Sequence, residues 1–199
     1  MGAPLGITCP FAQTSRGQAR ALDTSVSTAT GGFIVEVLSK EHDREAFDCG
    51  HSELNAYLRT QARQAMDRGC AIVYVLVPQR VPREIAGFYT LSSSSVRLSD
   101  WPDSVRKKLP RYPLVPVTLI GRLAVSGSHR GHRLGERLLI DALQRCHAAS
   151  RVVGSVAVIV DAKDADIASF YARYGFVAFP DQPLRLFLPM KTIGTLTES

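Results

Sequence analysis

Residues 117–125 read VTLIGRLAV, and residues 128–135 read SHRGHRLG. The first stretch is an apolar run typical of a buried strand, and the second is a turn of glycine and arginine. Leucines at helical spacing follow, so the turn opens a helix. Backbone N–H groups and the positive dipole end at such a helix start suit a pyrophosphate. An ordinary strand–turn–helix connection has the same glycines, and the rest of the sequence decides between the two.

The size and composition of the chain are those of a single globular domain. It has 199 residues, of which 45% are hydrophobic and 21% charged, which is enough for a buried core. No apolar run approaches the ~20 residues that span a bilayer, so we expect no membrane partner. The four cysteines are scattered and none has metal-ligand spacing, which predicts no metal and fits a reducing cytoplasm.

The N-terminal region differs in composition from the rest. Residues 1–32 are rich in Gly, Ser, Thr and Ala and lack the apolar core of a signal peptide. We expect a flexible, disordered leader over 1–32, one domain over 33–193 and a short tail over 194–199.

The positive charge is concentrated in one part of the chain. Residues 97–137 hold nine basic and three acidic residues, and the remainder of the chain is balanced. Such a local excess favours a polyanionic ligand, with nucleic acid as one candidate, over a merely soluble basic surface.

Hydrophobic periodicity predicts a mixed α/β domain. Residues 95–111 read as irregular or weakly helical. We expect one helix over 52–68, one that includes 134–146, and a short one capped by Asp164 or Asp166 that ends near 173. Strands are expected over 33–38, 71–77, 84–94, 115–125, 152–160, 177–179 and 184–190.

Five segments, taken in their order along the chain, resemble the GNAT acetyltransferase superfamily. Three of them resemble its toxins from toxin–antitoxin operons. The superfamily motifs are RGHRLG at 130–135 after the strand end LAV, and FYARYGF at 170–176. The toxin-like motifs are FDCG at 47–50 with LNAYL at 54–58, GFYTLS at 87–92, and GRLAV at 121–125.

The resemblance implies a GNAT fold: a mixed, mostly antiparallel central sheet with a splayed strand pair, flanked by helices. It also implies that the protein is an N-acetyltransferase that takes acetyl-CoA as its donor. In the toxins the acceptor is the α-amino group of an aminoacyl-tRNA, and its acetylation blocks translation. A DNA-binding antitoxin and a homodimer are the implied protein partners.

The resemblance also assigns site residues. Strand residues Leu123, Ala124 and Val125 would bind the pantetheine arm, and Arg130, Gly131, His132, Arg133, Leu134 and Gly135 would wrap the pyrophosphate. The far side of the arm would be lined by Asp164, Ser169 and Phe170. Arg133 stands where the family usually has glycine, which lets the backbone approach a phosphate closely. If its φ and ψ are ordinary, Arg133 can instead add a charge-assisted contact.

Tyr171 matches the position of the family's general acid. A phenol there can protonate the departing CoA sulfur. Glu84 is the only obvious acid on the predicted central strands, so a dedicated base is hard to find. An α-amino group, with a pKa near ~7.7–8.0, needs a base less than a lysine amine near ~10.4 does. This weakly favours an aminoacyl acceptor.

The basic segment before the cofactor-binding strand would face the tRNA. Contacts to the nucleic-acid backbone give affinity and salt dependence but little sequence selectivity. The residues concerned are Arg97, Arg106, Lys107, Lys108 and Arg111.

Two other functions remain open on the sequence. One is a GNAT enzyme that acetylates a small-molecule or protein amine. The other is a catalytically silent GNAT-like module that binds nucleic acid or a protein partner, which is less favoured because Tyr171 and the pyrophosphate turn occur together.

Overall fold

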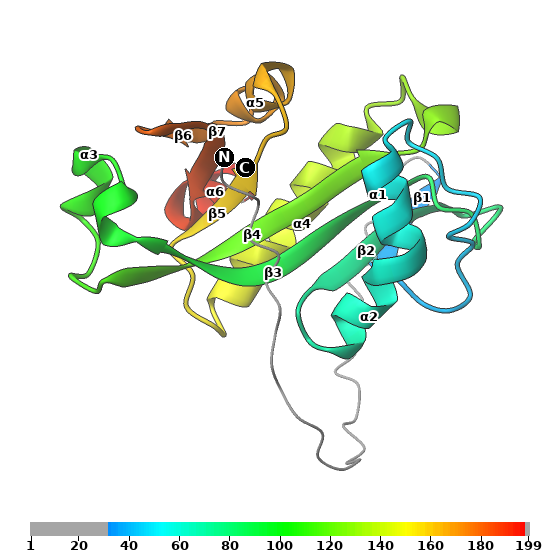
Figure 1. Ribbon diagram of the computed structural model, residues 1–199, viewed down its shortest axis with the longest axis horizontal. Coiled ribbons are helices and arrows are strands. Elements are labelled where there is room, and N and C mark those ends of the chain that lie inside the picture. The colour runs from blue at the N-terminus through cyan, green and yellow to red at the C-terminus, as the bar shows by residue number, and fades with distance from the viewer. Residues whose placement is uncertain (1–31, 198–199) are drawn as a thin grey trace, which may run out of the picture.

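The computed structural model describes residues 32–197, so the predicted leader lies outside the described residues except for Gly32. A seven-stranded sheet in the order β1-β2-β3-β4-β5-β7-β6 forms the centre (Figure 1). Its strands are β1 (Phe33–Val37), β2 (Ile72–Pro78), β3 (Gly87–Arg97), β4 (Leu114–Val125), β5 (Ala157–Asp161), β6 (Val177–Phe179) and β7 (Gln182–Pro189). All neighbouring strands are antiparallel except β4 and β5, which are parallel. The predicted mixed, mostly antiparallel sheet is confirmed.

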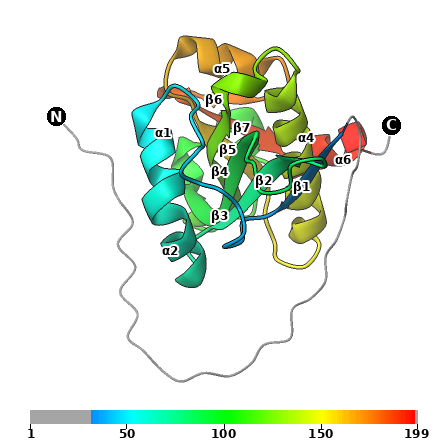
Figure 2. The same ribbon diagram turned by 90° about the vertical axis from the view of Figure 1, so that its right-hand side faces the viewer.

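Helices cover both faces of this sheet. Figure 2 shows α1 and α2 on one side of the strands and α4 and α6 on the other. The first face packs Leu58 and Phe88 in one apolar cluster, and the second packs Leu138 and Leu139 in another. The α-helices are α1 (Ser52–Ala56), α2 (Ala62–Asp67), α3 (Asp103–Arg106), α4 (Leu134–Ser150), α5 (Ala165–Ala172) and α6 (Met190–Thr197).

The middle of the sheet opens between β4 and β5. Their pairing covers only Thr118, Leu119 and Ile120 of β4, so among residues 32–197 the edge of 123–125 that faces β5 has no strand partner. Between Thr90 and Leu91 the register of β3 with β4 shifts by one residue, because Gly121 is an extra residue on β4. A bulge of this kind bends the strand and increases its twist, which separates β4 from β5 at the position where the family resemblance expects a splay.

Several predicted boundaries needed correction. The expected helix over 52–68 contains a π-helical turn at Tyr57–Gln61, which hydrophobic spacing does not reveal. The expected strand over 152–160 begins only at Ala157, since Val152 and Val153 lie exposed in the turn after α4. β3 begins later than expected and extends to Arg97, within the stretch predicted as irregular.

The C-terminal part of the chain also differs from expectation. Helix α6 (Met190–Thr197) was not predicted, and the expected domain boundary after Ile193 falls inside it. Ile193 is fully buried in the cluster under α4. Among residues 32–197, no helix combines the length and apolarity required to traverse a lipid bilayer.

Candidate active site

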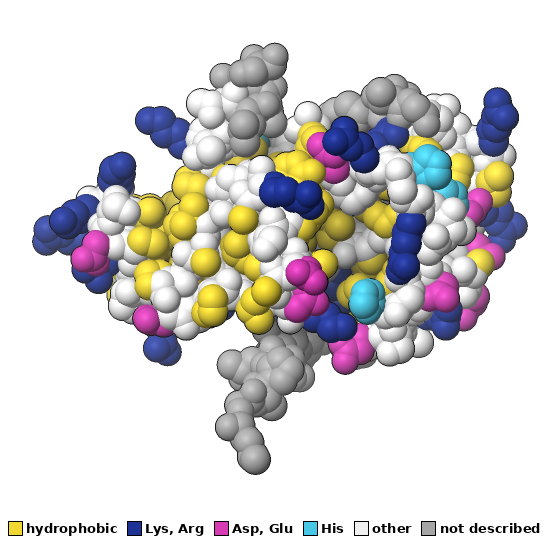
Figure 3. Space-filling model, turned by 90° about the horizontal axis from the view of Figure 1, so that it is seen from above, with side chains coloured by type: hydrophobic (Ala, Val, Ile, Leu, Met, Phe, Trp, Pro, Cys, Tyr) yellow, Lys and Arg dark blue, Asp and Glu magenta, His cyan; other side chains and the backbone are white. Residues whose placement is uncertain are grey.

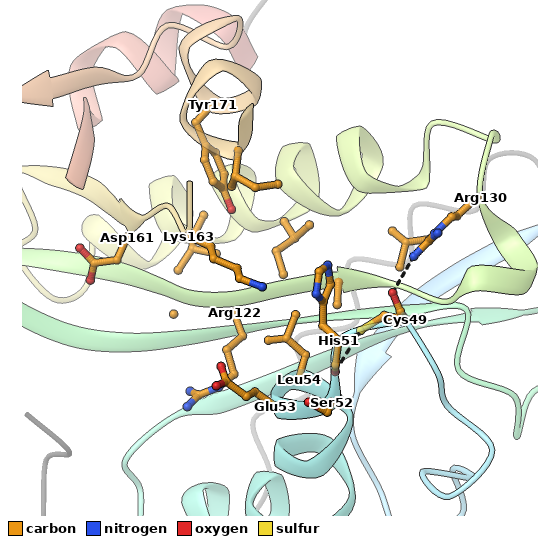
Figure 4. A pocket seen from close by; sticks show the side chains of 17 residues that line it. Cys49, His51, Ser52, Glu53, Leu54, Arg122, Arg130, Asp161, Lys163 and Tyr171 are labelled. Atoms are coloured by element: carbon orange, nitrogen blue, oxygen red, sulfur yellow. Dashed lines mark hydrogen bonds between the residues drawn. The ribbon is translucent and has the colours of Figure 1, made fainter. Parts of the chain in front are cut away.

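A cavity of about 550 Å³ lies where β4 and β5 separate. Three parts of the chain enclose it: the turn and first residues of α1, the end of β4, and the segment from β5 to α5 (Figure 4). Its walls are formed by Cys49, Gly50, His51, Ser52, Glu53, Leu54, Ile120, Gly121, Arg122, Leu123, Ala124, Val125, Arg130, Asp161, Lys163, Ile167 and Tyr171.

Tyr171 extends from α5 into this cavity (Figure 4). Its side chain is 6% exposed and packs against Phe170 and Phe176. Burial raises the pKa of Tyr171 to about 12, because a phenolate is poorly stabilised away from water. The hydroxyl is therefore protonated at neutral pH, as a general acid must be.

The β4 residues assigned to the pantetheine arm lie opposite this tyrosine-bearing helix. Leu123, Ala124 and Val125 all line the cavity, and their β5-facing edge is unpaired. Unpaired strand N–H and C=O groups are suited to hydrogen-bond amide groups of a ligand that takes the place of a strand.

The predicted pyrophosphate turn joins β4 to the 17-residue helix α4. Gly131 has φ 85° and Arg133 has φ 55°. Arg133 thus has the left-handed conformation that glycine favours at this position, so the condition of ordinary φ and ψ that was attached to its charge-assisted contact is not met. Its side chain is 87% exposed, and its Nε lies 3.6 Å from a carboxylate oxygen of Glu136. Leu134, the first residue of α4, is buried, and a Cβ on Gly135 would lie 3.9 Å from Val125 Cγ2.

Arg130 connects this turn to the other wall of the cavity. Its Nη2 donates a 2.7 Å hydrogen bond to the carbonyl of Cys49, and the carbonyl of Asp48 accepts from the Gly127 N–H at 2.8 Å. A Cβ on Gly50, which has φ 80°, would lie only 3.0 Å from Arg130 Nη2. His132 stays at the surface, where its Nδ1 lies 3.0 Å from the Arg130 carbonyl oxygen.

The FDCG and LNAYL motifs form the first wall. Asp48 accepts hydrogen bonds from the Gly50 N–H at 2.8 Å and from Asn55 Nδ2 at 2.7 Å. These bonds lower the pKa of Asp48. Asn55 Oδ1 in turn accepts from the Cys49 N–H at 3.0 Å. The motif therefore fixes the start of α1 against the pyrophosphate turn.

The three residues expected on the far side of the arm do not line the cavity. The side chain of Asp164 caps α5 by accepting from the Ile167 N–H at 2.9 Å, which settles the choice between Asp164 and Asp166. Ser169 is exposed, and Phe170 is half-buried beside Tyr174. Their assignment to the cofactor stays a prediction.

The predicted tRNA-facing residues lie far from the cavity. Figure 1 places α3 at the opposite end of the molecule from α1, and Figure 3 shows Lys and Arg side chains gathered at that end. Arg106 forms an ion pair with Asp103 at 2.6 Å. All five residues lie around α3 with side chains at least partly exposed: Arg97, Arg106, Lys107, Lys108 and Arg111.

Sequence reasoning gave no site role to six charged or polar side chains of the cavity: His51, Ser52, Glu53, Arg122, Asp161 and Lys163. Glu84, the acid it considered, is not in the lining and lies 3.5 Å from His129. The presence of Glu53 and Asp161 removes the argument that the missing acid favours an aminoacyl acceptor. Lys163 comes two residues after the end of the buried strand β5, and this position beyond a strand's carboxyl end was the available signal.

Comparison with known proteins identifies the family. The pattern of the family described as "Acetyltransferase (GNAT) domain" matches residues 117–191. The tRNA-acetylating toxin of Mycobacterium tuberculosis is 36% identical over 159 residues, which are 80% of this chain and 93% of that protein. The chain belongs to the GNAT acetyltransferases, among the toxins.

Two solved GNAT structures show the same architecture. AtaT complexed with acetyl-methionyl-tRNAfMet has a TM-score of 0.77 and 30% identity, covering 83% of this chain and 99% of that one. A mutant of the AtaT toxin, bound to the C-terminus of the antitoxin AtaR and to acetyl-CoA, has a TM-score of 0.71 and 26% identity, covering 85% and 100%. The predicted GNAT fold is confirmed, and the cavity lies at its β4–β5 splay.

Proposed function

We propose that this protein transfers the acetyl group of acetyl-CoA to the α-amino group of an aminoacyl-tRNA and thereby inhibits translation. One observation carries the proposal: a chain 36% identical to a tRNA-acetylating toxin has a protonated, buried tyrosine facing the unpaired edge of β4 across a cavity. Aminoacyl-tRNA as the acceptor places the reaction in the cytoplasm.

The residues around the splay fit the donor. Leu123, Ala124 and Val125 would hold the pantetheine arm along the unpaired β4 edge. The turn from Arg130 to Gly135 would hold the pyrophosphate at the positive end of α4. Asp164, Ser169 and Phe170 would flank the arm from α5. Acetyl-CoA supplies an activated thioester whose departing sulfur carries negative charge.

Tyr171 would supply the proton for that sulfur. Its raised pKa keeps the proton on the phenol until negative charge develops on the leaving group nearby. The attacking amine loses a proton as it becomes an amide, so the overall reaction consumes none.

The five basic residues around α3 would meet the tRNA at a distance from the acceptor end. A tRNA is longer than this domain, so contacts at α3 and at the cavity are compatible with one bound molecule. A GNAT enzyme acting on a small amine has no use for such a surface. This is the observation that favours the tRNA over the small-molecule alternative.

We also infer a cognate antitoxin that covers the toxin, because a structural relative has been solved with the C-terminus of its antitoxin. Pairing of two copies of this chain stays a prediction, and analytical ultracentrifugation of the purified protein measures it.

The decisive experiment incubates the purified protein with acetyl-CoA and aminoacylated bulk tRNA. Mass spectrometry of nuclease digests should show N-acetylated aminoacyl-adenosine, with equal release of free CoA. Deacylated tRNA, spermidine and a lysine-rich peptide are the matched acceptors. Acetylation of the peptide or the polyamine, with none on aminoacyl-tRNA, would contradict the proposal.

A further inference from the structure

The cavity contains two cations that the proposed reaction leaves unused. Arg122 comes from β4 and Lys163 from the segment after β5, and both line the cavity. Within the described part of the chain, neither has a carboxylate oxygen within 4 Å. The lining contains two acids, Glu53 and Asp161. Asp161 is paired with Arg185, whose Nε lies 3.4 Å from Asp161 Oδ1.

Arg122 is held in a fixed position by an aromatic ring. Its Cζ lies 3.7 Å from the centre of the Tyr57 ring, and Tyr57 in turn stacks on Phe88 with centroids 6.3 Å apart. Both aromatic side chains are buried. A guanidinium that stacks by its flat face leaves its N–H edge available for a bidentate contact with phosphate. Among residues 32–197 no side-chain hydrogen bond of Arg122 occupies that edge.

The direction of the side chain separates Arg122 from Leu123 and Val125, two of the three β4 residues assigned to the pantetheine arm. Side chains alternate along β4, and Ala124 packs in the cluster beneath α1 with Tyr57. Leu123 and Val125 pack against the cluster beneath α4 instead. Arg122 therefore lies on the α1 side, whereas the pyrophosphate turn leads into α4.

Lys163 reaches the same cavity from the segment between β5 and α5. Figure 4 shows its ammonium group directed into the cavity, beneath Tyr171 and toward His51. An acceptor amine that reaches Tyr171 from the α1 side must pass between β4, which carries Arg122, and the segment after β5, which carries Lys163. A cation from each side of the opening, both without ion-pair partners among the described residues, suits a single phosphate located one nucleotide from the amine.

We propose that Arg122 and Lys163 bind the phosphodiester that joins the last two nucleotides of the acceptor. The inference rests on the proposed function and sharpens it, because it gives the cavity a preference for amines attached to a nucleotide chain. A free amino acid or a polyamine has no phosphate for these cations. The exposed residues near α3 then add affinity for the body of the tRNA without defining its end.

The test compares two small acceptors in steady-state kinetics. One is an amino-acid ester of adenosine, and the other is the same ester of cytidylyl-adenosine, which adds only the phosphodiester-linked nucleotide. Arg122→Gln and Lys163→Gln should each raise the KM for the dinucleotide ester about tenfold, the size expected for a lost charged hydrogen bond. Arg122→Lys keeps the positive charge but loses the two parallel N–H donors of the guanidinium. Its KM for the dinucleotide ester should lie between the values of the wild type and Arg122→Gln. Lys40→Gln, an exposed cation beyond β1, is the matched control.

Three readings are expected to stay constant in the variants: the KM for the adenosine ester, the kcat, and the KM for acetyl-CoA. An unchanged acetyl-CoA KM also shows that the variants are folded. Equal losses with both esters would overturn the proposal, since the residues would then only shape the cavity. A raised acetyl-CoA KM would overturn it too, by assigning the cations to the donor.

The wild-type protein separates this inference from the function on which it rests. If it acetylates aminoacyl-tRNA but has the same KM for the adenosine ester and the dinucleotide ester, the proposed phosphate site is wrong and the proposed function stands. If it acetylates neither aminoacyl-tRNA nor the esters while binding acetyl-CoA, both are wrong.

Discussion

The two ends of the β3–β4 hairpin both carry cations, but they hold them differently. At the cavity end, Arg122 is stacked on a buried ring. At the α3 end, the five basic side chains are more exposed, and of these Arg106 pairs with a neighbouring aspartate. A fixed cation can define the position of one phosphate. Exposed cations act at longer range and are screened by salt. They therefore attract the tRNA but do not define where a particular phosphate binds.

The cavity end is also the more rigidly connected of the two. The Tyr89 hydroxyl donates to the Asp141 carboxylate, which accepts from Arg145 Nε at 2.8 Å. Arg145 lies over the ring of Tyr74 at 4.4 Å. A Cβ on Gly87 would come within 2.8 Å of Leu138, so β3 and α4 approach closely here. The α3 end is anchored mainly by Trp101 against aromatic rings of β6 and β7.

The largest effect is expected at the cavity end, from Tyr171→Phe. Loss of the proton donor should lower kcat about a hundredfold or more, while isothermal titration still shows acetyl-CoA binding. Tyr174→Phe, three residues along and less buried, is the matched control and should keep its activity. Full turnover by Tyr171→Phe would remove this tyrosine from the mechanism.

The second effect tests whether the cavity end is the rigid one. Asp141→Ala leaves the Tyr89 hydroxyl and Arg145 without their buried partner, which should lower the free energy of unfolding by about 3–5 kcal/mol. Urea denaturation measures it. Asp166→Asn, an exposed aspartate on α5, should change stability by less than about 0.5 kcal/mol. Similar values for the two variants would mean that this network contributes little.

The third effect tests the exposed cations. Reversing both Lys107→Glu and Lys108→Glu should raise the KM for aminoacyl-tRNA about tenfold at low salt, with the difference shrinking as salt increases. The KM for acetyl-CoA should not change. The control pair Lys40→Glu and Arg80→Glu alters the charge equally at exposed positions outside the α3 region. An equal rise of the KM for aminoacyl-tRNA in both double variants would mean that only the total charge of the protein matters, and that the α3 surface has no special role.

The smallest effect is expected at the pyrophosphate turn. Arg133→Gly removes a left-handed backbone strain of about 1 kcal/mol, partly offset by the greater chain entropy of glycine. The melting temperature should hold or rise slightly, whereas the Kd for acetyl-CoA should increase severalfold through loss of the charge. Arg133→Lys keeps both charge and strain, so its Kd should remain close to wild type. An unaltered Kd in Arg133→Gly would show that the arginine contacts no phosphate.

The sequence alone was sufficient for the family, the fold class and most of the elements. The motifs around Arg130 and Tyr171 identify a GNAT domain because they are local: a turn that opens a helix, and a helix face of fixed spacing. Periodicity located β4 and α4 well for the same reason. Periodicity wrongly included Val152 and Val153 in a strand, because an apolar run does not reveal whether other parts of the fold cover it.

Tertiary structure decided which side chains share the cavity. Lys163 and Glu53 are far apart in the sequence, and they line the same cavity because the β4–β5 splay and the start of α1 face one another. The π turn at Tyr57 likewise has no local sequence signal. Local conformational preferences follow from the order of neighbouring residues, whereas the proximity of charges that are distant in sequence depends on how strands pair and helices pack.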